Sequence, residues 1–383
     1  MLDYDQEIRP TITDAFWTPN YQTGFLARCV PATPAELAAS EFPSLRALGS
    51  IAPKLGSLAD DALDDFLAGF LAEPEFSPCS GSVELCEAAA RAYVNLAAHL
   101  IHRPAFAVRK ALPPAVARPL WSLSKHLNRL PSLTYASYVL SNFTSPVEPR
   151  SAATDVRVAQ TPTGTHDEDW FVAIHVSVES AGGEIVKAVD IIDRALEIGD
   201  DFSLVEALGS VESCMCFVIE VTPKLRERLA PAVFRDEIRP LLYGHDRIRF
   251  SGVEGEPTVT YIGVSGAQSG VVRAVDAVLG VRHSEGIQAS MNPFLACASQ
   301  THQRFFARAG GIGSRLANSR ISERARQAHR RALESLAEFR RAHLAIVADY
   351  LETGTSTQGT GGTHFNSWLQ ELIHETEVAA KAC

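Results

Sequence analysis

The amino-acid sequence predicts a mainly α-helical protein, with a large all-helical C-terminal domain and a smaller, mostly helical N-terminal domain. Apolar residues recur at spacings of three and four through most of the second half of the chain, which is the period of an amphipathic helix. Runs with the alternating pattern of a strand are scarce. The chain of 383 residues is also long enough to build two hydrophobic cores.

The first half of the chain is punctuated by prolines and ends in a polar connection. Thr33-Pro34-Ala35-Glu36 combines an N-cap residue, a proline at the first helical position and an acid in the first turn, so a helix is predicted to start there. Proline, threonine and serine are frequent in residues 144–167, and we place the connecting segment at residues 151–168. We interpret this segment as a linker between a small domain, 1–150, and a large domain, 169–383.

Most of the remaining pattern is helical. The predicted helices are 83–102, 132–143, 169–197, 203–219, 231–243, 266–281, 292–308 and 321–351. The best strand candidate is Thr258-Val259-Thr260-Tyr261-Ile262. Glycine and threonine dominate residues 352–363, which we expect to form a mobile loop.

Composition excludes several classes of function. The net charge of −10 argues against a general nucleic-acid binder, because neutralising phosphates needs an excess of Lys and Arg. The seven cysteines show no repeating framework, and the acidic start does not resemble a secretory signal, so we expect free thiols in a reducing cytoplasm. No uninterrupted apolar run reaches the roughly 18 residues of a membrane-spanning helix, and we expect no membrane partner.

His343 lies on the apolar side of the predicted helix 321–351, together with Leu336, Phe339, Ile346 and Tyr350. Spacing alone favours a core histidine that is hydrogen-bonded to a neighbour. The alternative is a ligand that reaches from the helix to a metal or haem inside a bundle. No second metal-binding motif accompanies it, and a single protein ligand suits haem better than zinc.

Two further residues allow a structural and a functional interpretation. His175 ends the mostly apolar run 170–175, where it is either a buried core histidine or a group in a site. Arg239 can pair with Asp236 on its own helix or hold a ligand carboxylate, and spacing favours the pair.

Four segments together resemble the indoleamine 2,3-dioxygenase family. Phe339-Arg340-Arg341-Ala342-His343-Leu344-Ala345-Ile346-Val347 is similar to its proximal-histidine helix, and Gly359-Thr360-Gly361-Gly362-Thr363 to its substrate loop. Ser265-Gly266-Ala267-Gln268-Ser269, with Asp276 beyond it, resembles another loop of the family, and Tyr135-Ala136-Ser137-Tyr138-Val139-Leu140 resembles its distal-pocket helix. The resemblance covers about residues 85–383.

The resemblance implies a haem b enzyme that uses O2 and an external electron donor to keep its iron ferrous. It implies that the large domain holds the haem and that the small domain caps the distal side. His343 would be the iron ligand, and Arg340, Asp276 and Ser265 would lie beside the cofactor. The implied substrate-binding residues are Tyr135, Tyr138, Phe171, Phe234, Arg239, Ser265, Gly266 and Thr360, with Arg239 on the substrate carboxylate.

The implied reaction is the cleavage of L-tryptophan to N-formylkynurenine, by insertion of oxygen from O2 across the indole 2,3-bond. The alternative is a haem-dependent monooxygenase that acts on a tryptophan derivative in a natural-product pathway. A haem-based sensor without turnover is a third interpretation. His175 stands where many family members have a serine, and Tyr138 replaces a smaller residue. We expect His175 to act in catalysis, as the acceptor of a hydrogen bond from the indole N–H.

Overall fold

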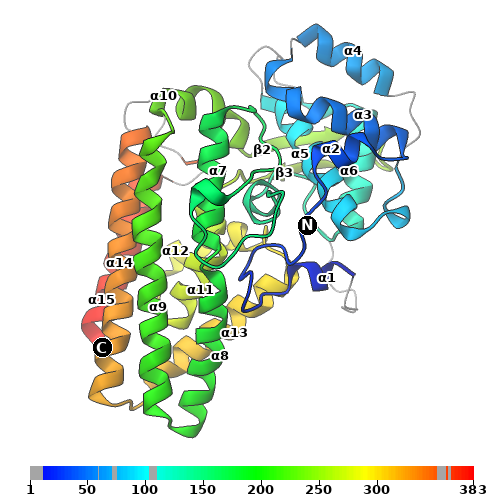
Figure 1. The fold of residues 1–383 in the computed structure, drawn as a ribbon. Coiled ribbons are helices and arrows are strands. Elements are labelled where there is room, and N and C mark those ends of the chain that lie inside the picture. The colour runs from blue at the N-terminus through cyan, green and yellow to red at the C-terminus, as the bar shows by residue number, and fades with distance from the viewer. Residues whose placement is uncertain (1–11, 59, 71–75, 103–109, 352–358, 361–363) are drawn as a thin grey trace.

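The computed structural model describes residues 12–58, 60–70, 76–102, 110–351, 359–360 and 364–383. It is mainly α-helical, as the sequence predicts, and its larger part is a bundle of long helices that run side by side (Figure 1). The helices of this part are α7 (His166–Glu179), α8 (Gly182–Ile198), α9 (Asp201–Val221), α10 (Pro231–Val233), α11 (Gly270–Val278), α12 (Glu285–Leu295), α13 (Gln300–Asn318), α14 (Glu323–Leu351) and α15 (Phe365–Ala382).

The first part of the chain forms a separate group of shorter helices at the upper right of Figure 1. They are α2 (Pro34–Ala38), α3 (Pro43–Ile51), α4 (Asp60–Phe70), α5 (Val83–His102) and α6 (Pro114–His126). The predicted helix start at Thr33 is confirmed, because Thr33 and Glu36 form a reciprocal capping box. Helix α1 (Ile12–Trp17) lies apart from this group, and Trp17 packs edge-on against His302 of α13.

A small sheet and several short turns connect these helices. Strand β1 (Ala111–Leu112) pairs in parallel with β2 (His245–Phe250), which pairs antiparallel with β3 (Thr258–Tyr261). Because β1 precedes residue 150 and β2 follows residue 169, the sheet joins the two predicted domains, and their boundary stays a prediction. The described 3-10 turns are η1 (Ala52–Ser57), η2 (Pro78–Ser80), η4 (Ala153–Asp155), η5 (Thr222–Glu227), η7 (Arg239–Leu242) and η8 (Gly266–Gln268).

Several predicted helices are interrupted. The expected helix 169–197 is two helices, which Ser180 and Ala181 separate. The backbone of residues 21–24 packs against the start of the second helix, where a Cβ at Gly183 would lie 2.3 Å from the carbonyl oxygen of Tyr21. The expected helix 292–308 is also wrong, since Ser299 caps the start of α13 and separates it from α12.

Two segments that border the site depart from regular α-helix. The expected helix 132–143 is reduced to one π-helical turn, η3 (Ala136–Leu140). The expected helix 231–243 is α10, a second π-helical turn η6 (Phe234–Ile238) and the 3-10 turn η7. Single π-helical turns often occur at functional sites. Helix α15 is missing from the predicted set, although Leu369, Leu372 and Thr376 follow a helical period.

One helical stretch of the described chain, Asp201–Glu227, is long and apolar enough to cross a membrane by length and composition. It packs between α8 and α14 through a buried side that includes Leu208, Val211, Met215 and Val218. Core helices of bundles pass the same test, so this stretch is no more than weak evidence for a membrane span.

Candidate active site

A largely apolar cavity of about 260 Å³ lies among α7, α11, α14, α15 and the two π-helical turns. Every residue that the sequence analysis assigned to the site borders this cavity. They are Tyr135, Tyr138, Phe171, His175, Phe234, Arg239, Ser265, Gly266, Asp276, Arg340, His343 and Thr360. The structure therefore brings together segments that are more than 200 residues apart, while the roles of the individual residues stay predictions.

Two buried carboxylates of α7 hold the tyrosines of the first π-helical turn. The hydroxyl of Tyr138 donates to Glu168 at 2.7 Å, and the hydroxyl of Tyr135 donates to Glu179 at 3.2 Å. Burial raises the pKa of Glu168 to about 6 and that of Glu179 to about 7, against the donors around them. Burial also raises the pKa of each tyrosine well above 10.0, so both hydroxyls remain donors.

Glu179 also fixes the start of α11. It accepts hydrogen bonds from the Ser269 hydroxyl at 2.5 Å and from the backbone N–H groups of Gly270 and Val271, each at 3.2 Å. These N–H groups have no partner within their own helix, and a carboxylate at this end also interacts favourably with the helix dipole. The segment from Ser265 to Ser269 is thereby tied to α7 along one wall of the cavity.

His175 presents one defined face to the cavity. Its Nδ1 lies 2.8 Å from the carbonyl oxygen of Phe171, which can only accept, so Nδ1 carries the proton. Burial lowers the pKa of His175, which favours the neutral ring. In this tautomer Nε2 is an acceptor. Sequence spacing left a core histidine and a site residue equally open, and the ring borders the cavity.

An aromatic wall continues from α7 to α14. The ring of Phe171 lies 4.4 Å from His175, 6.2 Å from Tyr138 and 5.2 Å from Phe234, measured between centroids. The Phe234 ring in turn meets Tyr350 edge-on at 5.6 Å. These rings are tilted by 41° to 79° to one another and form an apolar wall against which an aromatic ligand can pack.

His343 projects from α14 into the same cavity. Its ring stacks on Phe339 at 5.8 Å, and it makes no hydrogen bond with any residue that the structure describes. Spacing alone favours a core histidine that is hydrogen-bonded to a neighbour, and no such hydrogen bond is present among the described residues. Burial, helped by the nearby His175, lowers the pKa of His343 to about 4. The result is a neutral imidazole at the cavity wall that no described residue hydrogen-bonds.

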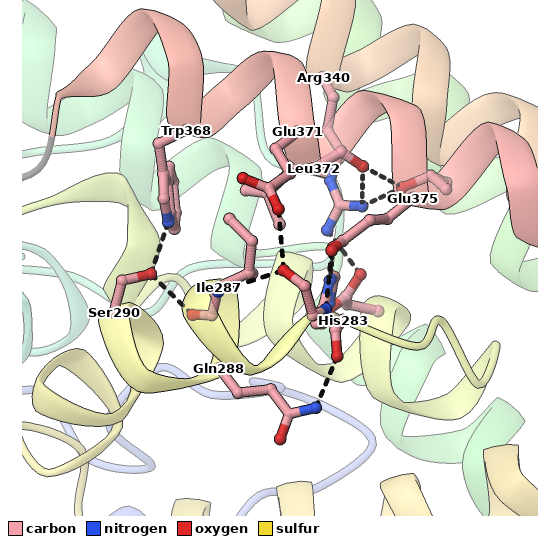
Figure 2. Close-up of polar contacts among 12 residues, drawn as sticks. His283, Ile287, Gln288, Ser290, Arg340, Trp368, Glu371, Leu372 and Glu375 are labelled. Carbon is pink, nitrogen blue, oxygen red and sulfur yellow. Dashed lines mark hydrogen bonds and ion pairs between the residues drawn. The ribbon is translucent and has the colours of Figure 1, made fainter.

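A buried ionic network supports the helix that carries His343 (Figure 2). Arg340 donates to Asp276 at 2.5 Å, as expected, and also to the carbonyl oxygen of Leu372 at 3.1 Å. His283 lies between Asp276 and Glu375, 2.5 Å from each. Although burial opposes both shifts, these partners lower the pKa of Asp276 and raise that of His283.

Helix α15 closes the cavity next to this network. The indole N–H of Trp368 donates to Ser290 of α12 at 2.8 Å, and Ser284 donates to Glu371 at 2.8 Å (Figure 2). Trp368, Leu369 and Leu372 then border the cavity. Sequence reasoning missed these residues, because the helical period of α15 follows a Gly/Thr-rich segment that was read only as a loop.

Arg239 is a buried cation at the second π-helical turn. Asp236 pairs with Arg235 at 2.7 Å, so the predicted pair between Asp236 and Arg239 is wrong. Arg239 is 6% exposed, borders the cavity and lies over the ring of Tyr243 at 5.2 Å. Its burial next to an apolar cavity suits a guanidinium that meets a ligand carboxylate.

Two residues of the Gly/Thr-rich segment are described. Gly359 and Thr360 border the cavity, and the Thr360 hydroxyl donates to the carbonyl oxygen of Val264 at 2.5 Å. Residues 352–358 and 361–363 of the expected loop lie outside the described residues, so the expectation of mobility stays a prediction.

The chemistry of the cavity fits a haem. The described residues contain no cluster of three or more His, Cys, Asp or Glu side chains that could bind a metal ion by themselves. A metal at His343 would therefore need its other ligands from elsewhere, and a porphyrin supplies four in its own plane. A neutral imidazole that has no partner in the described part of the chain and an apolar lining meet the needs of such a group.

Comparison with known proteins identifies the family. The family model described as indoleamine 2,3-dioxygenase matches residues 82–353. The indoleamine 2,3-dioxygenase acdA of Aspergillus candidus is 27% identical over 298 residues, which covers 68% of this chain and 72% of the relative. Indoleamine 2,3-dioxygenase 1 of Mus musculus is 26% identical over 303 residues, which covers 71% of this chain and 74% of the relative. A myoglobin of Haliotis diversicolor is 25% identical over 293 residues, which covers 70% of this chain and 75% of the relative. Because the family match spans most of the chain, from the start of α5 to the end of α14, this protein belongs to the indoleamine 2,3-dioxygenase family and is a haem-dependent enzyme of that type.

Proposed function

We propose that this enzyme cleaves the indole ring of L-tryptophan to N-formylkynurenine, by inserting both atoms of O2 across C2 and C3. The observation that carries the proposal is the pair of neutral imidazoles on one cavity. His343 has no hydrogen-bond partner among the described residues, and His175 keeps an acceptor nitrogen beside an aromatic wall. One suits an iron ligand and the other suits an indole N–H.

The residues around His343 hold and orient the cofactor. His343 would bind the iron of haem b through its Nε2, and the Arg340–Asp276 pair would keep its helix in place. Ser265, with the loop that it begins, lies along the edge of the cavity. The haem, when bound, supplies a ferrous centre at which O2 reacts, and an external electron donor keeps that centre reduced.

A second group of cavity residues, apart from those around His343, binds the substrate. Arg239 holds the carboxylate, and Thr360 lies near the polar end of the amino acid. Phe171, Phe234 and Tyr138 enclose the indole ring. His175 accepts the indole N–H, which orients the 2,3-bond; the electron-rich ring reacts from its own π system and needs no obligatory base.

Oxygen labelling tests this proposal against its alternatives. The protein is reconstituted with haem, reduced, and given L-tryptophan under labelled O2, and the product is analysed by mass spectrometry. Two labelled atoms in N-formylkynurenine support the proposal. One labelled atom supports the monooxygenase alternative. Because two relatives are named myoglobin, a third outcome is also tested, in which the protein binds O2 without turnover. A stable O2 complex that gives no product after tryptophan is added would reject both reactions.

A further inference from the structure

A third arginine, besides Arg239 and Arg340, borders the cavity, and neither the substrate clamp nor the Asp276 pair accounts for it. Arg273 lies on α11, three residues before Asp276, and therefore on the same face of that helix. Its guanidinium donates to the carbonyl oxygen of Ala267 at 3.2 Å and lies 6.0 Å from the ring of Phe306. It forms no ion pair with any carboxylate of the described residues.

The carboxylates near Arg273 already bind other cationic side chains. Asp276 is the nearest, but Arg340 binds one of its oxygens and His283 lies 2.5 Å from the other. Glu375 is bound to His283. Arg340 and His283 are thus bound to Asp276 and Glu375, and Arg273 forms no ion pair with either carboxylate in the described chain.

The other ionisable neighbour is not an anion. Cys297 lies close to Arg273, and burial raises the pKa of its thiol to about 11, so the thiol is uncharged at neutral pH. Burial also lowers the pKa of Arg273 itself. A guanidinium that loses water without gaining a carboxylate is costly, and a ligand that brings the missing negative charge removes that cost.

The position of Arg273 distinguishes it from Arg239. Arg239 comes from η7, beside the aromatic wall of Phe234, where an indole amino acid would lie. Arg273 comes from α11, one turn from the Asp276–Arg340 pair that supports the His343 helix. Arg239 and Arg273 thus lie on different parts of the cavity wall. Four of the five N–H donors of Arg273 have no partner in the described chain, which leaves its fork available for a bidentate carboxylate.

We propose that Arg273 binds a propionate carboxylate of the haem and thereby fixes the cofactor at the α11 edge of the cavity. This inference rests on the proposed function, because it requires that the cavity takes haem. A carboxylate there gives Arg273 a counter-charge that the Arg340–Asp276–His283 network does not provide. It leaves Arg239 to the substrate.

The test is the rate at which the reconstituted protein loses haem to an excess of apomyoglobin. Arg273→Gln should release haem roughly 10- to 150-fold faster than the wild type, the range expected for a lost hydrogen bond to a charged group. Arg273→Lys should recover part of the difference. Arg304→Gln, at an exposed position on α13, is the matched control and should release haem at the wild-type rate.

A second cofactor separates propionate binding from a packing role. Haem dimethyl ester has no propionate charge, so wild type and Arg273→Gln should release it at the same rate. A difference that persists with the ester would show that Arg273 acts through Ala267 or Phe306 and would overturn the proposal. Equal release of ordinary haem by both proteins would also overturn it.

The outcomes also separate this inference from the proposed function. A wild type that retains haem with histidine ligation, together with an unaffected Arg273→Gln variant, rejects only the propionate site. A folded wild type that takes up no haem rejects both. If Arg273→Gln weakens the spectral response to tryptophan while haem release stays normal, Arg273 is a substrate clamp and the propionate site is rejected.

Discussion

Replacing His175 by serine tests the assigned role of this residue most directly. In the structure, Nδ1 donates to the Phe171 carbonyl, and Nε2 is the acceptor of a neutral ring. An indole N–H can therefore form one hydrogen bond here, whereas a 1-methylindole leaves the buried nitrogen without a donor and adds a methyl group where the bond would form. We predict that His175→Ser keeps haem and part of its activity but loses most of the preference for tryptophan over 1-methyltryptophan.

The size of the effect follows from the burial of His175. An unsatisfied buried acceptor costs about 1–3 kcal/mol, which corresponds to roughly 5- to 150-fold in kcat/KM. The assay compares kcat/KM for the two substrates in wild type and variant, with haem content measured in parallel. Because burial lowers the pKa of His175, the acceptor form persists below pH 6.5, and kcat/KM for tryptophan should stay flat through that pH and fall at lower values. Equal discrimination in both proteins would return His175 to a core role.

Three further perturbations address the remaining parts of the site. His343→Ala should lose haem or the spectrum of histidine ligation, and unchanged haem content and spectrum would refute the ligand assignment. Arg239→Leu should cost about 2–5 kcal/mol, roughly 30- to several-thousand-fold in kcat/KM, and normal turnover would move the clamp elsewhere. Glu179→Gln should lower the melting temperature, because the amide brings an NH2 group to a site where Tyr135, Ser269, Gly270 and Val271 already donate. Burial raises the pKa of Glu179 from 4.5 to about 7, so its stabilising contribution is full below pH 4.5 and is lost as the pH rises through 7. The difference in melting temperature between wild type and variant should therefore narrow over that pH range. A difference that stays constant with pH in thermal unfolding would contradict this.

The sequence pattern predicts the large helices well, because burial of one helix face leaves a period of three and four in the apolar residues. Helix α14 and the inward position of His343 follow from that period. The same period is present in α15, yet the sequence does not show that this helix closes the cavity. Its position depends on Trp368, Glu371 and Glu375, whose partners on α12 and the preceding turn come from another part of the chain.

The polar contacts are less predictable, because they depend on local geometry or on distant partners. Spacing assigned Asp236 to Arg239, as in an α-helix, but the π-helical turn at 234–238 changes which side chains are neighbours, and Arg235 takes the acid instead. The buried Glu168 and Glu179 carry no local signal at all. Their tyrosine partners lie 30 and 44 residues away in the sequence.

Helix α7 shows how a histidine at position 175 is compatible with this cavity. Glu168, Phe171, His175 and Glu179 follow one another at helical spacings of three, four and four, and so share one face. The two carboxylates at the ends of this face bind the tyrosines of the same π-helical turn, while the two rings between them meet the ligand space. The distance between the helix and the cavity is therefore set at its ends and not by residue 175. A substitution at 175 changes the group that faces the ligand without moving the helix, so the His175→Ser comparison measures the hydrogen-bond acceptor rather than the fold.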